Sequence, residues 1–123
     1  MSYYKAEVGE VIIKKEFRKD LGRLYEEKYD EIENEVIKEW ILPYLPAWWL
    51  PPKKWDHRVY KDEWEGKYKT TYNENNGVFV YGVAYNANGF YGLSMRDFFW
   101  KILPMIVEKI ISQDRYDEGY DTD

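Results

Sequence analysis

The segment from Pro43 to Trp55 constrains the fold of this chain more than any other stretch of its sequence. It holds four of the five prolines and three of the six tryptophans. Proline lacks a backbone donor and fixes φ, so neither a helix nor a central strand can run through this segment. Tryptophan is a large apolar side chain and a frequent anchor at protein interfaces. The segment therefore either packs under the domain or contacts a partner, and the sequence favours neither.

Size and composition predict one folded domain. The chain has 123 residues, 45% of them hydrophobic, which suits a domain of roughly 100–150 residues. It has no cysteine, which excludes disulfides, a cysteine nucleophile and thiolate metal sites. The N-terminus lacks a signal-peptide pattern, and no apolar run is long enough to span a bilayer. We expect a soluble protein of the cytoplasm, or of the host cytoplasm if it is viral, without membrane contact.

Hydrophobic periodicity predicts an α+β fold with a small antiparallel sheet. Apolar residues at three- and four-residue steps predict a helix over about 19–42, which Pro43 ends. Alternating strand formers on either side of a turn at 73–77 predict a hairpin over about 67–85. An N-terminal strand over 3–13 completes the predicted sheet.

A second helix is predicted over about 94–112, capped by Ser94 and kinked by Pro104. It is apolar around most of its circumference, so the sheet, the first helix and the proline-rich segment must cover it, or else a second copy of the chain. A homodimer through this helix is therefore one expectation. We assign residues 1–113 to a single α+β domain and residues 114–123 to an acidic, mobile tail.

The charge pattern points towards a basic partner. The net charge is −5, which disfavours direct binding to duplex nucleic acid. On the predicted first helix, Glu27, Glu31 and Glu35 follow one another at four-residue steps, with Glu26 and Asp30 beside them. Such a row is usually the solvated side of an amphipathic helix, but it can also imitate phosphates and engage a basic, nucleic-acid-handling protein.

The tryptophans of the proline-rich segment are the second candidate contact. Trp48 and Trp49 are adjacent, so an extended backbone points them in opposite directions, and one can be buried while the other is exposed. Trp55 lies in a short basic cluster that contains Lys53, Lys54 and Arg58. We predict a partner-binding surface made of the acidic helix face and this aromatic loop, comprising Glu26, Glu27, Asp30, Glu31, Glu35, Trp48, Trp49 and Trp55.

Catalytic signals are weak. Asp56 followed by Glu65-Gly66-Lys67 has the outline of a magnesium-dependent nuclease site, in which carboxylates bind the cation and a lysine stabilises charge at phosphorus. Glu-x-Lys is common by chance in a chain with 33% charged residues. His57 is the only histidine, and no partners for a triad are marked. We therefore expect no catalytic residues, no cofactor and no metal.

These observations lead to three hypotheses of different classes. The first is a non-enzymatic protein-binding module, such as a viral or mobile-element inhibitor or adaptor that acts on host defence by CRISPR or restriction systems. The second is a virion or tail subunit that assembles through its apolar last helix. The third is the magnesium-dependent nuclease. The sequence favours the first, because an acidic helix face and a rigid aromatic loop occur together.

Overall fold

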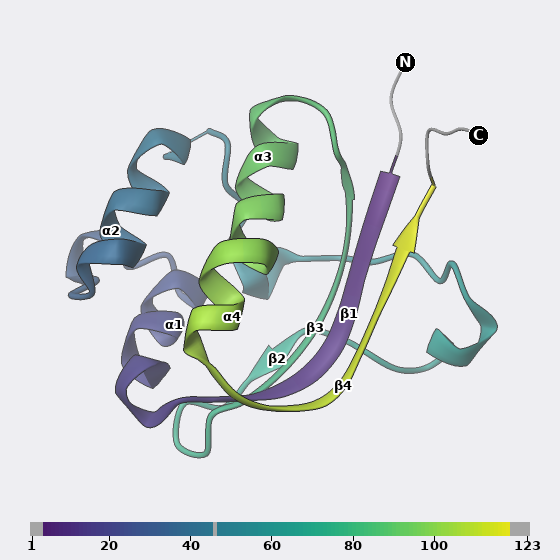
Figure 1. Cartoon of the computed structure of the whole chain (residues 1–123), viewed down its shortest axis with the longest axis horizontal. Coiled ribbons are helices and arrows are strands. Elements are labelled where there is room, and N and C mark those ends of the chain that lie inside the picture. The colour runs from purple at the N-terminus through teal and green to yellow at the C-terminus, as the bar shows by residue number, and fades with distance from the viewer. Residues whose placement is uncertain (1–3, 46, 119–123) are drawn as a thin grey trace.

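A computed structural model describes residues 4–45 and 47–118 (Figure 1). The strands are β1 (Tyr4–Ile13), β2 (Thr71–Tyr72), β3 (Val78–Asn86) and β4 (Val107–Asp117). The α-helices are α1 (Arg18–Tyr25), α2 (Glu35–Ile41), α3 (Gly89–Asp97) and α4 (Leu103–Ile106). A π-helical turn, Phe98–Ile102, joins α3 to α4, and short 3-10 turns occur at Lys15–Phe17, Tyr29–Glu31, Leu42–Tyr44, Pro52–Lys54 and Asp62–Trp64.

The four strands form one antiparallel sheet in the order β2-β3-β1-β4. β1 lies inside the sheet. Its side chains alternate between the two faces, and most of those on either face are buried. Val11 and Ile13 belong to the main core, whereas Ala6 and Val8 pack against Trp64 on the opposite face. The predicted α+β fold with a small antiparallel sheet is confirmed.

The helices cover one face of the sheet, and the loop that carries Trp64 lies on the other side (Figure 1). Under the helices, Trp49 and Trp55 pack with Phe98, with ring centroids 5.6 Å from the phenylalanine in both cases. Trp40 meets Trp49 edge to face at 5.0 Å. Aromatic pairs in such tilted arrangements contribute about 0.5–1.5 kcal/mol beyond their area burial. Much of the proline-rich segment is therefore core.

The predicted hairpin is confirmed, although its first strand is shorter than expected. β2 begins only at Thr71, not at residue 67, because Tyr68 has a positive φ of 64° and turns the backbone before the strand. The turn closes as expected, since the Asn73 side chain accepts hydrogen bonds from two backbone amides of the turn. Gly77 completes it at φ 76°, a conformation that costs glycine nothing.

The prediction of one helix over 19–42 is wrong, because the chain breaks into α1 and α2. Glu27 has a positive φ of 63°, which ends the helical path after α1. Asn34 then starts α2, where its side-chain oxygen accepts a hydrogen bond from the Ile37 amide at 3.1 Å. The three- and four-residue spacing of apolar residues continues through the break, because both helices pack their apolar side chains into the same core.

The prediction of a helix over 94–112 is also wrong. α3 begins at Gly89, so Ser94 lies inside it, and the Ser94 hydroxyl contacts the carbonyl oxygens of Trp48 and Tyr91 at 2.7 and 2.8 Å. Pro104 stands in the first turn of α4, after the π-helical turn. The chain then becomes a strand at Val107. The β-branched residues Val107, Ile110 and Ile111 favour extended backbone.

Most apolar side chains of α3, α4 and the π-helical turn are buried within the chain, so this region does not require a second copy to cover it: Met95, Phe98, Phe99, Ile102, Leu103 and Ile106. The predicted tail is corrected in part, since residues 114–117 belong to β4 and pair with β1. Residues 119–123, like residue 3 of the predicted first strand, lie outside the described residues. Within the described chain, no helix combines the length and apolar character that a membrane span requires.

Candidate functional site

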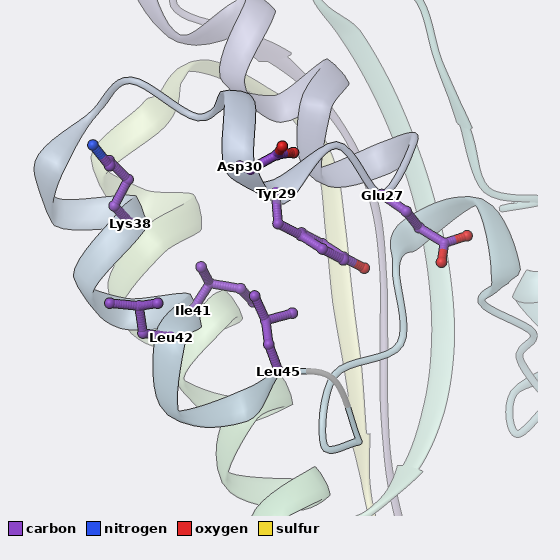
Figure 2. A pocket seen from close by; sticks show the side chains of 7 residues that line it. All are labelled: Glu27, Tyr29, Asp30, Lys38, Ile41, Leu42 and Leu45. Carbon is purple, nitrogen blue, oxygen red and sulfur yellow. The ribbon is translucent and has the colours of Figure 1, made fainter.

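A groove with an apolar lining opens between the 3-10 turn Tyr29–Glu31 and the helix α2 (Figure 2). Its cavity volume is about 410 Å³. The lining comes from one continuous stretch of chain that doubles back on itself, and its residues are Glu27, Tyr29, Asp30, Lys38, Ile41, Leu42 and Leu45.

The groove exists because the chain reverses between α1 and α2. Asp20 in α1 is buried and accepts hydrogen bonds from the backbone amides of Glu33 and Asn34, at 3.1 and 2.9 Å. Arg23 donates to the same carboxylate at 2.8 Å. This carboxylate therefore fixes the start of α2 against α1 and holds the Tyr29–Glu31 turn opposite Ile41.

The floor and the rim of the groove differ in exposure. Ile41 is only 2% exposed and belongs to the main core, whereas Leu42 is 66% exposed. Tyr29 is partly buried against the core. Burial, with a smaller effect from the charge of Glu27, raises the pKa of Tyr29 to about 12. Its hydroxyl therefore stays protonated at neutral pH and can donate a hydrogen bond to a ligand.

The charges around the groove are only partly neutralised within the chain. Glu27 pairs with Lys54 at 3.1 Å, and Lys38 pairs with Glu35 at 3.5 Å. Asp30 makes no ion pair with any described residue. The rim thus offers one free carboxylate beside an exposed leucine, which suits a cationic group next to an apolar one.

The predicted acidic row is not one continuous helix face, because its helix is broken. Glu27 and Asp30 line the apolar groove, whereas Glu26 and Glu31 line a separate polar hollow beside α1. Glu35 stands in the first turn of α2, where a carboxylate favours the helix N-terminus. The structure therefore brings only two of the five predicted acids to the groove.

The basic cluster of the proline-rich segment packs against these acids. Lys53 contacts Glu26 at 2.9 Å, as Lys54 contacts Glu27. The two lysines thereby hold the Pro52–Lys54 turn beside the end of α1. Part of the acidic charge that the sequence offered to a partner is paired inside the chain.

The structure buries two of the three predicted tryptophans and exposes the third. Trp49 and Trp55 are 5% and 7% exposed and belong to the core, so neither is available to a partner in this conformation. Trp48 is 46% exposed and its ring lies 5.5 Å from that of Phe90, which is exposed as well. Of the aromatic loop, only Trp48 remains a candidate contact.

The residues of the nuclease hypothesis lie between α2 and β2. Asp56, Glu65 and Lys67 are all exposed, on the loop that crosses the sheet. Among residues 4–45 and 47–118, no three His, Asp or Glu side chains lie close enough together to bind a metal ion.

Sequence reasoning missed the apolar residues of the groove, above all Tyr29, Leu42 and Leu45. A continuous helix would have placed Tyr29 in the buried stripe with Ile41. The signal that could have found the groove is Asn34-Glu35, a helix start within the apolar period, because it implies a chain reversal before α2.

Comparisons with known proteins add no relative to this description: no family model, no curated protein and no solved structure gives a significant match to the chain.

Proposed function

We propose that the chain is a non-catalytic protein-binding module, and that its groove receives an apolar side chain of a partner protein. The observation that carries the proposal is the 66% exposure of Leu42 on the rim of a groove of about 410 Å³. Concave, mostly apolar surfaces with a few polar groups are the usual form of a binding site. Leaving such a surface in water is unfavourable, and a partner that covers it gains the free energy of burial.

Charge selects the class of partner. Asp30 is free of ion pairs among the described residues, and the chain as a whole carries a net charge of −5. A partner segment with Lys or Arg next to its apolar anchor would match both features, and such complementarity steers association and sets specificity. The partner we propose is a basic amphipathic segment, laid with its apolar side into the groove.

Trp48 supplies a second contact close to the first. Its backbone amide donates to the carbonyl oxygen of Tyr44 at 2.8 Å, which ties it to the turn that ends α2. Together with Phe90 it forms an exposed aromatic pair. Tryptophan is enriched among the residues that dominate binding energies, so a partner that covers the groove and reaches Trp48 gains an additional anchor.

An inhibitor or adaptor of the kind carried by viruses and mobile elements is one form of this proposal, in which the basic segment belongs to a nucleic-acid-handling protein. The virion subunit and the nuclease remain predictions, and no particular contact of the described residues favours either of them.

Selection of peptides from a random displayed library tests the proposal. We expect peptides selected on the protein, after depletion on a Leu42→Glu variant, to combine apolar residues with Lys or Arg. They should bind Leu42→Glu at least about tenfold more weakly, a loss of about 1.4 kcal/mol. Val59→Glu is the matched control, because Val59 is a similarly exposed aliphatic residue (47%) outside the groove. Peptides without basic residues, equal binding to both variants, or an empty selection would each contradict the proposal.

A further inference from the structure

β4 is a long edge strand whose outer side pairs with no other described strand. It spans 11 residues, and most of them are exposed. Ile110 and Ile111 are 54% and 49% exposed, although isoleucine is normally buried in a sheet. A long, open edge strand with exposed apolar side chains is a template for pairing with another strand, and proteins usually protect such edges. The edge of β4 therefore requires an explanation that the groove does not provide.

The register with β1 shows which face each β4 side chain occupies. Ile110 pairs with Val11, on the face that the helices cover. Gln113 and Arg115 lie on the same face, because they line a hollow of about 430 Å³ next to α4 and the π-helical turn. Lys109 and Asp114 lie on the opposite face, where Asp114 accepts a hydrogen bond from the Trp64 indole at 3.0 Å.

The charge sequence of β4 is complementary to itself when it is read in the antiparallel direction. Glu108-Lys109 stands before the two isoleucines, and Asp114-Arg115 stands after them. A two-fold axis between Ile111 and Ser112 sets Lys109 opposite Asp114 of the second copy, and Glu108 opposite Arg115. Opposite charges at directly facing positions stabilise a strand pair, whereas like charges destabilise it.

We infer that two copies of this chain associate through β4, in this register, to form one continuous sheet. Residues that face each other in this register also lie on the same face of the sheet. Ile110 meets Gln113 of the second copy on the helix-covered face, and Lys109 meets Asp114 on the other. In such a symmetric interface each contact occurs twice, so the two ion pairs become four.

The same axis explains the open hollow beside β4. A two-fold axis perpendicular to the sheet puts the helices of both copies on the same side, so the two hollows meet across it. The shared space is lined from each copy by Val107 and Ile110, which one copy leaves partly uncovered, and by the buried Leu103 at its base. Burial of this surface adds the apolar contribution that strand pairing alone lacks.

Existing contacts leave these side chains able to pair. Asp114 is bonded to Lys61 at 3.0 Å but keeps a 42% exposed side chain, and Arg115 contacts Glu7 only through its Nε atom. Glu108 and Lys109 make no ion pair with any described residue. The pairing of β4 with β1 shifts register between Glu10 and Val11 and again between Ile12 and Ile13. Such bulges bend an edge strand. The inferred register places the bulge opposite Glu10 and Val11 at the two-fold axis.

The molecular mass in solution tests the association. Sedimentation equilibrium of the full chain should give twice 15.0 kDa at high concentration, with dissociation on dilution. Lys109→Glu places a carboxylate opposite Asp114 and should weaken the dimer at least about tenfold. Lys69→Glu makes the same charge change near the opposite edge of the sheet and should leave the dimer intact. A mass of 15.0 kDa at every concentration, or equal dimerisation of the two variants, would overturn the inference.

Cysteine cross-linking tests the register. Because the chain has no native cysteine, only the introduced cysteines can form disulfides. A mixture of Ile110→Cys and Gln113→Cys chains should oxidise to a covalent heterodimer, because these positions face each other. Ile110→Cys mixed with Ser112→Cys should cross-link far more slowly, since those side chains lie on opposite faces. Equal rates for the two mixtures would show that the copies meet in some other way and would refute the register.

Discussion

Glu7 is the most unusual single residue of the chain, a carboxylate buried inside the sheet at 3% exposure. Arg115 donates to it from Nε at 3.0 and 3.1 Å, and the Tyr85 hydroxyl at 3.2 Å. Burial nevertheless raises the pKa of Glu7 above its ordinary value, because the loss of hydration outweighs these partners. The ionised side chain therefore costs stability, while its contacts tie β1, β3 and β4 together.

The stability of the protein should consequently depend on the ionisation of Glu7. The unfolded carboxyl titrates near 4.5 and the folded one above it, so between these values the native state binds more protons than the unfolded state. The free energy of unfolding then falls as pH rises through this window. Glu7→Gln does not titrate, so its stability relative to the wild type should rise with pH above 4.5. Parallel curves from denaturation at several pH values would contradict this assignment.

At the scale of elements, the sequence predicts what a local pattern determines. The hairpin follows from alternation and from Asn73 to Gly77, whose side chains and backbone close the turn without distant help. The strand β1 follows in the same way, because neighbouring residues of extended backbone face opposite sides. Trp48 is exposed and Trp49 buried as expected, but Trp48 lies in a turn whose amide bonds to the Tyr44 carbonyl, so the extended backbone assumed from the sequence is not the cause.

The elements that could not be predicted depend on contacts between distant residues. The break between α1 and α2 is held by Asp20, whose partners lie 13 and 14 residues further along the chain. Residues 107–111 are apolar enough for a buried helix, but pairing with β1 makes them a strand. Periodicity cannot separate a short apolar strand from a helix without its neighbours.

Replacement of Asp20 tests the contact that shapes the groove. Asp20→Ala leaves the Glu33 and Asn34 amides without their acceptor, so we expect a loss of about 1.5–3 kcal/mol in the free energy of unfolding, as for hydrogen bonds to a charged group. Asp30→Ala, which removes an exposed carboxylate without ion pairs among the described residues, should change it by less than about 0.5 kcal/mol. Chemical denaturation measures both variants, and similar losses for the two would show that Asp20 does not hold the reversal.

For the whole molecule, the fold redistributes the residues of the predicted contact surface. An acidic and an aromatic contact were expected, and Asp30 and Trp48 remain exposed for such roles. The groove that Asp30 lines could not be predicted, because it requires the chain to reverse where periodicity indicated a straight helix. The same reversal pairs Glu26 and Glu27 with lysines of the proline-rich segment, which removes acids that a continuous helix would have exposed.

We propose above all that the groove beside Leu42 binds a basic amphipathic segment. The most direct measurement is a titration of isotope-labelled protein, followed by amide NMR shifts, with a helical Leu/Lys peptide and with its twin in which Glu replaces every Lys. We expect saturable shifts for the Lys peptide, centred on Tyr29, Asp30, Leu42 and Trp48, and weaker binding of the Glu twin by about tenfold or more. Shifts centred elsewhere, or equal binding of the two peptides, would contradict it.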